Sequence, residues 1–240
     1  MTRLFAAFMF LLFAASAQAS AQSFNAQEQA EIRAIVRDYL VRNPDVLREA
    51  LDALAERTDA QRWQTISSDT RDFSIGPADA PIVIVEFFDY RCTFCHAALE
   101  WVNDVARTRN DVRIVFKEFP ILSEASMESA RAAIASMPQG RYLAFHRALM
   151  NFRGDLTSQR IDQLARESGI DVTRMRRAMD NPEVTRLLED NRAHAIDMGN
   201  TATPLFVING EMVAGFDQAR LDARLREATR EVRERRQAQR

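Results

Sequence analysis

The stretch IVIVEFFDYRCTFCHAAL, Ile82–Leu99, contains the only two cysteines of the 240-residue chain, Cys92 and Cys95. Its first part, Ile82–Phe88, is a run of β-branched and aromatic residues that is typical of a buried strand. From Leu99 onward, apolar residues return at three-residue steps, which indicates a helix. The Cys-x-x-Cys motif therefore lies where a predicted strand passes into a predicted helix.

The sequence on the C-terminal side of this stretch predicts how the strand and helix continue into a domain. A second strand is predicted in DVRIVFKEFP, and strand, helix and strand at this spacing form a βαβ unit with a right-handed crossover. Residues 123–200 carry apolar stripes and capping residues that indicate a block of helices. The segment TPLFVINGEMVAGF then predicts two strands joined by Asn209-Gly210, a strong hairpin signal, before a last helix that begins near Asp217.

The position of the two cysteines favours disulfide exchange. Cys92 is expected at the helix N-terminus, where free backbone N–H groups and the helix dipole favour a thiolate. Cys95 is expected one turn later and more deeply buried. An exposed nucleophilic thiolate beside a recessed resolving thiol is the arrangement that disulfide exchange requires.

The two cysteines also allow three other uses. A structural disulfide across two intervening residues closes a very small loop and adds little stability. Cys92–His96 also matches the attachment motif of c-type haem, but covalent haem domains do not place that motif directly behind a buried strand. Two thiolates also suit Cu(I), so a copper-handling chaperone is the alternative from a different functional class.

The N-terminal residues 1–19 predict a secretory signal peptide. Arg3 precedes an apolar run of about a dozen residues, which is too short to span a bilayer comfortably, and Ala17-Gln18-Ala19 offers a cleavage site. The alternative is an uncleaved membrane anchor. Export, with a periplasmic location, permits disulfide chemistry. The formal net charge of −2 argues against nucleic acid as a partner.

Residues 24 to about 60 predict two consecutive helices broken near Asn43. Pro44 suits the first position of a helix, with Asn43 as its cap. Both helices carry apolar stripes that need a partner. The stripes either pack on the chain's own main domain or form an oligomerisation stalk.

The active-site stretch, taken together with TPLFVINGEMVAGF, resembles the DsbA-like branch of the thioredoxin superfamily over about residues 73–235. The resemblance implies an α/β fold, in which a thioredoxin domain is interrupted by a helical insertion. It also implies a cis-proline that faces the disulfide, at Pro204 after Thr203, where a substrate backbone would pair. The segment Glu31–Leu54 is similar to the extension of ScsC-like proteins, the suppressor-of-copper-sensitivity relatives, some of which form trimers that act as disulfide isomerases.

These observations predict five segments along the chain. They are the signal peptide at 1–19, an N-terminal helical extension at 20–70, the first half of the thioredoxin fold at 71–122, the helical insertion at 123–200, and the second half of the thioredoxin fold at 201–240.

Glu86 is a further candidate, because a charged residue within an apolar strand is costly unless it is paired or neutral. DsbA-like proteins often carry an acid at this position beneath the disulfide. We hypothesise that Glu86, paired with Lys117 in the adjacent strand, assists proton transfer at Cys95. The alternative is a solvated surface pair. His96 is a candidate for stabilising the Cys92 thiolate, although its helical direction is expected to point it outward.

The predicted function is that of an exported thiol-disulfide oxidoreductase, with Cys92 and Cys95 as catalytic residues assisted by Thr203, Pro204 and Glu86. No cofactor or metal is required. The expected partners are cysteine-containing exported proteins, a membrane redox partner, and further copies of the chain in a homotrimer formed through the N-terminal helices. The isomerase or reductase direction is favoured over that of a monomeric disulfide oxidase, because a stalk would place several active sites in one assembly.

Overall fold

The computed structural model describes residues 24–239, which fall into two compact units divided between Leu54 and Ala55. The predicted signal peptide lies outside the described residues. No helix among residues 24–239 combines the length and the apolar character needed to cross a bilayer.

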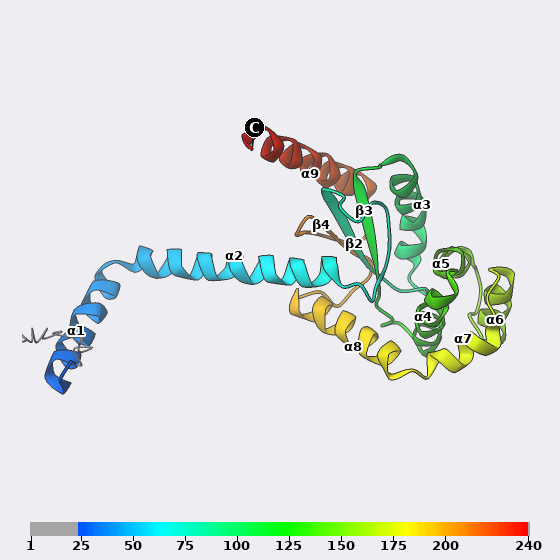
Figure 1. Ribbon diagram of the computed structural model, residues 1–240, viewed down its shortest axis with the longest axis horizontal. Helices are drawn as coiled ribbons and strands as arrows, with labels where there is room; N and C mark the ends of the chain where they lie inside the picture. The colour runs from blue at the N-terminus through cyan, green and yellow to red at the C-terminus, as the bar shows by residue number, and fades with distance from the viewer. Residues whose placement is uncertain (1–23, 240) are drawn as a thin grey trace, which may run out of the picture. The chain divides into compact units, whose positions relative to one another are not determined.

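The first unit contains helix α1 (Ala26–Arg42) and the beginning of helix α2 (Pro44–Ser68), as Figure 1 shows. α1 begins with a capping box in which Asn25 and Glu28 each accept a hydrogen bond from the backbone N–H of the other. The predicted break near Asn43 is confirmed, and Asn43 directly precedes Pro44, the first residue of α2, but its side chain does not cap that helix. Its side-chain amide and its backbone N–H both donate to the Tyr39 carbonyl, so Asn43 closes α1 instead.

Most apolar side chains of this first unit are exposed. α1 has no buried residue, and Ile35 is 69% exposed while Leu51 in α2 is 65% exposed. Exposed apolar residues of this size, repeated along two helices, are an unusual surface for an isolated chain. The described residues therefore leave the predicted apolar stripes uncovered.

The second unit is built on a five-stranded sheet with the strand order β1-β3-β2-β4-β5. β2 and β3 are parallel, and the other neighbouring pairs are antiparallel. The strands are β1 (Phe73–Ile75), β2 (Ile82–Phe88), β3 (Val112–Glu118), β4 (Leu205–Ile208) and β5 (Glu211–Ala214). The two predicted strands beside the cysteine motif and the predicted hairpin are thus confirmed.

The hairpin turn between β4 and β5 follows from its two residues. Asn209 and Gly210 have φ angles of 49° and 95°, the left-handed conformation that a tight two-residue turn requires at both positions. The Asn209 side chain also accepts a hydrogen bond of 2.8 Å from the Val83 backbone N–H, which ties the turn to β2.

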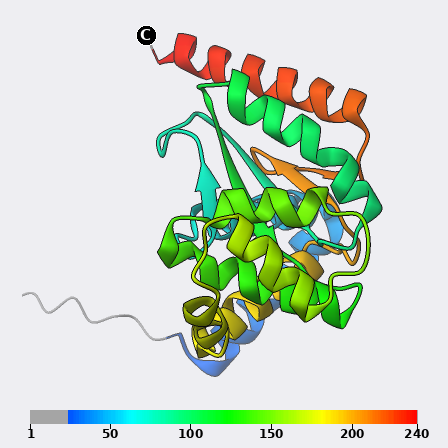
Figure 2. The ribbon, with the colours of Figure 1, turned by 90° about the vertical axis from the view of Figure 1, so that its right-hand side faces the viewer.

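Helices cover both faces of the sheet (Figure 2). α3 (Thr93–Thr108) and α9 (Gln218–Ala238) pack on one face, where Val102 and Leu221 join a core with Ile84 and Phe206. The end of α2 and part of α8 (Pro182–Asp197) cover the other face, which buries Val85, Phe87 and Val115. Because successive strand residues point to opposite faces, the sheet carries two separate cores.

A helical insertion joins β3 to β4, as predicted. Ser123, Thr157, Asp171 and Asn181 cap the N-termini of four of its helices, each by accepting a backbone N–H. The insertion comprises α4 (Glu124–Ser136), a short 3-10 helix (Met137–Gln139), α5 (Tyr142–Asn151), α6 (Ser158–Glu167), α7 (Val172–Met179) and α8. The structure is therefore a thioredoxin-like fold with an inserted helical domain.

Candidate active site

Cys92 caps the N-terminus of α3, as predicted. Its Sγ accepts the backbone N–H of Cys95 at 3.3 Å. The pKa of Cys92 is lowered from 9.0 to about 6, chiefly by a hydrogen bond from the Cys95 side chain. Hydrogen bonds from the Thr203 side chain and from the amides of Cys95 and Phe94 act in the same direction, while burial opposes them. Near neutral pH, Cys92 is therefore mostly a thiolate.

Cys95 lies one turn further along α3 and is 1% exposed, against 6% for Cys92. Burial raises the pKa of Cys95 far above its ordinary value, and the neighbouring Cys92 raises it further. Both cysteines are free. Cys92 is thus less exposed than the sequence predicted, but the pair still combines a thiolate at the helix N-terminus with a more deeply buried thiol, which is the division of roles that disulfide exchange requires.

The loop before β4 faces the thiol. The peptide bond between Thr203 and Pro204 is cis, and the Thr203 carbonyl oxygen lies 3.3 Å from Cys92 Sγ. The thiol form of Cys92 can donate to this carbonyl, whereas the thiolate cannot. The structure therefore brings Thr203 and Pro204 to the cysteine pair from 111 residues away in sequence.

Glu86 is fully buried in β2, on the face of the sheet that α3 covers. Burial raises its pKa to about 8, and the charge of Cys92 acts in the same direction. The Glu86 carboxyl makes no hydrogen bond within residues 24–239. At neutral pH, Glu86 is therefore mostly protonated and uncharged beneath the thiol pair.

The predicted pairing of Glu86 with Lys117 is wrong. Glu86 lies opposite Phe116 in the parallel ladder, and Lys117 lies opposite Phe87, so the two side chains point to different faces of the sheet. Lys117 is fully buried on the other face, where its ammonium forms an ion pair with Asp72. The alternative, a solvated surface pair, is also wrong, because Glu86 and Lys117 are both buried.

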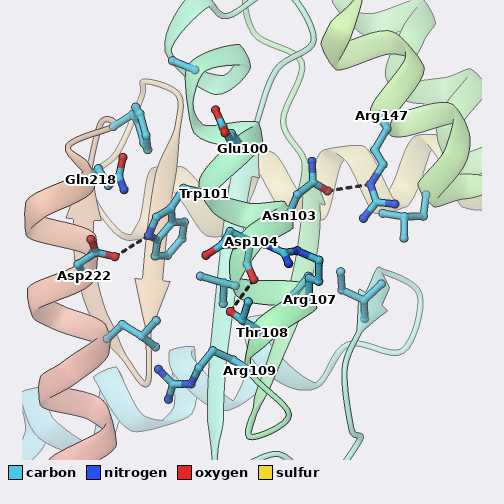
Figure 3. Close-up of a pocket in the computed structure, with 17 residues that line it drawn as sticks. Glu100, Trp101, Asn103, Asp104, Arg107, Thr108, Arg109, Arg147, Gln218 and Asp222 are labelled. Atoms are coloured by element: carbon cyan, nitrogen blue, oxygen red, sulfur yellow. Dashed lines mark hydrogen bonds and ion pairs between the residues drawn. The ribbon is translucent and has the colours of Figure 1, made fainter.

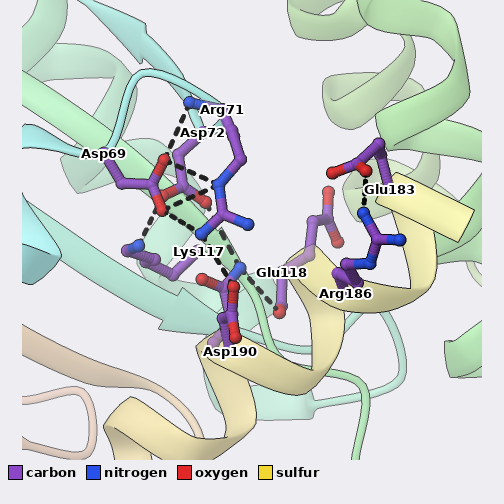
Figure 4. Close-up of polar contacts among 9 residues, drawn as sticks. Asp69, Arg71, Asp72, Lys117, Glu118, Glu183, Arg186 and Asp190 are labelled. Carbon is purple, nitrogen blue, oxygen red and sulfur yellow. Dashed lines mark hydrogen bonds and ion pairs between the residues drawn. The ribbon is translucent and has the colours of Figure 1, made fainter.

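Figure 4 shows the polar cluster around Lys117. The Arg71 guanidinium bridges Asp69 at 2.6 Å and Asp190 at 2.8 Å, which closes the cluster towards solvent. The Asp72 carboxylate also accepts a hydrogen bond from Asn191. The cluster therefore joins the segment before β1 to β3 and α8. Breaking its buried Lys117–Asp72 pair would leave an uncompensated charge inside the protein.

Asp89 is a positioning residue that the sequence analysis missed. Its buried carboxylate accepts the backbone N–H groups of Arg91 at 2.7 Å, Ile121 at 2.8 Å and Leu122 at 3.0 Å. These bonds tie the loop that carries Cys92 to the loop after β3. An acidic residue directly after a buried strand and before the motif was the available signal, because such a side chain commonly bonds nearby backbone N–H groups.

A second buried polar network was also missed. The hydroxyl groups of Tyr90 and Tyr142 donate to the Glu118 carboxyl at 2.7 and 2.8 Å, and Tyr90 also contacts His146 Nδ1 at 3.2 Å. Burial holds the pKa of Glu118 well above its ordinary range and lowers that of His146 to about 3. The network joins the residue two positions before Cys92 to β3 and to α5 of the helical insertion.

His96 is engaged away from the thiolate. Its Nε2–H donates to the Tyr90 carbonyl at 2.7 Å, and its Nδ1 accepts from Arg153 at 3.1 Å. Burial is the largest cause that lowers the pKa of His96. Both ring nitrogens are therefore satisfied in the neutral form, and the imidazole makes no hydrogen bond to Cys92 Sγ in the part of the chain that the structure describes.

A cleft along the outer side of α3 lies apart from the cysteines, neither of which lines it (Figure 3). Two hydrogen bonds join side chains that line it. Trp101 Nε1 donates to Asp222 at 2.8 Å, and Arg147 donates to Asn103 at 2.7 Å. These bonds link α3 to α9 and to α5.

The fold and the dithiol together define a thioredoxin-fold protein with a disulfide-exchange centre. The chain belongs to the family of the DSBA-like thioredoxin domain, whose model matches residues 83–226. Members of this family are thiol-disulfide oxidoreductases. The model of the ScsC N-terminal domain, described as a copper resistance protein domain, matches residues 28–61.

Solved structures agree with this family. A thioredoxin-like oxidoreductase from Silicibacter pomeroyi is 35% identical, with a TM-score of 0.67 over 71% of this chain and 97% of that one. A linker-deleted mutant of Proteus mirabilis ScsC is 26% identical, with a TM-score of 0.66 over 88% and 100% of the two chains. A Na⁺/H⁺ antiporter NhaA of Herminiimonas arsenicoxydans is 30% identical over 71% of this chain, which spans only 29% of that relative's length.

Proposed function

We propose that this protein is an exported thiol-disulfide oxidoreductase that exchanges disulfides with cysteine-containing proteins, in the isomerase or reductase direction. The single observation that supports this most is the asymmetry of the pair. Cys92 has a pKa lowered to about 6, whereas the pKa of Cys95 is raised by burial. Members of the family are thiol-disulfide oxidoreductases found in the periplasm, and this supports the periplasm as the compartment of this protein.

In the proposed reaction, the Cys92 thiolate attacks one sulfur of a substrate disulfide. A bond forms between Cys92 Sγ and that sulfur, and the other substrate sulfur leaves as a thiolate. In isomerisation, a second substrate thiolate then attacks the mixed disulfide and releases Cys92. In reduction, Cys95 loses its proton, attacks Cys92 Sγ and releases the substrate as a dithiol, so that the enzyme is left oxidised.

Glu86 is proposed to take the proton of Cys95. The negative charge of Cys92 contributes to the raised pKa of Glu86. That charge disappears when Cys92 enters the mixed disulfide, so the pKa of Glu86 falls at the step when a base is needed. In the resting enzyme Glu86 is mostly protonated. When the charge of Cys92 is lost in the mixed disulfide, Glu86 releases this proton to solvent, and the carboxylate that remains can then accept the proton of Cys95.

Thr203 and Pro204 are proposed to hold the substrate backbone beside the thiol. The support is the contact of 3.3 Å between Cys92 Sγ and the Thr203 carbonyl oxygen. This carbonyl is at the reacting sulfur, and an extended substrate segment could donate a backbone N–H to it. The same loop would then orient the substrate disulfide for attack.

The N-terminal helices are proposed to assemble the chain into a homotrimer. The support is the set of exposed apolar side chains on α1 and α2 and the match of residues 28–61 to the ScsC N-terminal domain. Several reduced active sites in one assembly favour isomerisation, because a substrate can be attacked repeatedly before it leaves. A membrane redox partner would keep the cysteines reduced.

The experiment that tests this function compares refolding of scrambled ribonuclease by the full chain and by the double variant Val36→Glu with Leu51→Glu. Both side chains are more than half exposed. We expect light scattering to show a trimer for the full chain and a monomer for the variant. Isomerase activity should fall about tenfold or more in the variant, while insulin reduction stays within about twofold, because avidity is lost but the dithiol is intact.

The matched control is Gln27→Glu with Gln29→Glu, which adds the same charge at two exposed polar positions of α1. This control should remain trimeric and active. A full chain that is monomeric, or a monomeric variant with full isomerase activity, would contradict the isomerase proposal and favour a monomeric disulfide oxidase.

A further inference from the structure

A pocket opens beside the N-terminus of α3, next to the reacting cysteine. Arg91 and Thr93, which flank Cys92 in the chain, line one part of it, together with His96. The segment 152–155, which follows α5, lines the opposite part. The pocket therefore lies between the catalytic loop and the helical insertion. A substrate whose cysteine reacts with Cys92 would place the residues next to that cysteine near this pocket.

Two arginines of this pocket are held in place by neutral acceptors. Arg91 Nη1 donates to the Gly154 carbonyl at 2.5 Å. Arg153 Nη1 donates to the Met150 carbonyl at 2.7 Å and to His96 Nδ1 at 3.1 Å. Carbonyl and imidazole acceptors fix the position of a guanidinium group without cancelling its charge, so both arginines keep their positive charge and further N–H donors.

Little negative charge compensates the two arginines. Asp155 Oδ1 lies 3.8 Å from Arg91 Nη2, and its side chain is 91% exposed, so this pair is weak. Within residues 24–239, Arg153 has no carboxylate within ion-pair distance. This contrasts with Arg176, which binds both Glu128 and Asp162. The pocket thus has a net positive charge.

His96 does not change this balance. Burial, Arg153 and Arg91 all lower its pKa, while the hydrogen bond to the Tyr90 carbonyl and the charge of Asp89 raise it. The net result is a lowered pKa, so His96 is neutral at pH 7. Its ring serves as a spacer that holds Arg153 against the catalytic loop.

We propose that this pocket binds a carboxylate that the substrate carries close to its reacting cysteine. The inference rests on the proposed function, because the pocket has value only if Cys92 attacks a substrate disulfide. Arginine matches a carboxylate with paired N–H donors, and a pocket shielded on one side strengthens the contact. The carboxylate belongs either to an aspartate or glutamate of a polypeptide or to a small thiol that bears free carboxylates.

The test measures the rate at which Cys92 forms a mixed disulfide in the full-length Cys95→Ser variant. The substrates are symmetrical peptide disulfides that carry either glutamate or glutamine at each of the two positions on either side of the cysteine. For at least one position, we expect the glutamate peptide to react roughly tenfold faster at low salt. The advantage should shrink as salt is added, because the pocket is open to solvent.

The ratio of the glutamate rate to the glutamine rate is then compared between variants. It should fall towards one in Arg153→Gln and in Arg91→Gln, and Arg153→Lys should restore only part of it. The matched control Arg186→Gln removes the same charge from an exposed position of α8 and should leave the ratio unchanged.

A second arm uses oxidised glutathione and its ethyl ester, in which the carboxylates are blocked. Discrimination among the peptides alone supports a polypeptide carboxylate, and discrimination against the ester alone supports a small thiol. Equal rates for every matched pair would overturn the inference while leaving the proposed function intact. No mixed disulfide with any substrate would instead contradict the proposed function.

Discussion

Replacement of Cys92 by serine is expected to lower insulin reduction by at least about 1,000-fold, because a serine hydroxyl does not ionise near neutral pH and cannot attack a disulfide. The hydrogen bonds that lower the pKa of Cys92 to about 6 would have no thiolate to stabilise. Turbidity of reduced insulin in the presence of dithiothreitol measures this loss.

The matched variant Cys95→Ser should fail in a different way. Its Cys92 still attacks, but no second thiol is present to release the substrate in the reductive step. A mixed disulfide between Cys92 and the substrate should therefore accumulate and be visible by mass spectrometry. If Cys95→Ser retained full reduction, or if Cys92→Ser were the variant that trapped substrate, the assigned roles would be reversed.

Replacement of Glu86 by glutamine is expected to remove a large pH dependence of stability. The pKa of Glu86 is raised from 4.5 to about 8 in the folded protein, so between these values the folded state binds more protons than the unfolded state. The free energy of unfolding of the natural chain therefore falls as pH rises through this window. From pH 5 to pH 8 the decrease due to Glu86 should be at most about 3 kcal/mol, and it is smaller in the oxidised protein, where the charge of Cys92 no longer raises the pKa of Glu86.

Urea unfolding of the oxidised protein at several pH values measures this difference. The oxidised form is required because a free Cys92, whose pKa is lowered to about 6, would stabilise the folded state as pH rises and mask the effect. The pH dependence that Glu118 adds to the free energy of unfolding is the same in Glu86→Gln and in the natural chain, so it cancels when the two proteins are compared. Glu49→Gln, at an exposed position of α2, is the control and should follow the natural chain. Parallel curves for Glu86→Gln and the natural chain would show that the carboxyl is ionised in the folded state.

The sequence was sufficient to predict the centre of the fold because its signals there are local. The β-branched run Ile82–Phe88 specifies a buried strand, and the cysteine motif directly behind it must then occupy the start of a helix. The Asn209-Gly210 turn needs only its two residues and their neighbours. For these elements, a short window of sequence contains the physical cause of the structure.

The partners of the buried charged residues could not be read in the same way. Lys117 pairs with Asp72, which is 45 residues earlier in the chain, because the β2–β3 register places Lys117 on the face away from Glu86. The contact between Arg153 and His96 joins residues 57 positions apart. Such pairs depend on the strand register and on how the helical insertion packs, and neither leaves a periodic trace in the sequence.

The measurement that tests the central claim most directly is the titration of the Cys92 thiolate by its ultraviolet absorbance in the reduced protein, with the oxidised protein as the blank. Cys95 does not interfere, because burial raises its pKa far above the range measured. The account predicts a single thiolate that appears with a midpoint at about pH 6. A midpoint near the ordinary cysteine value of 9.0 would contradict it.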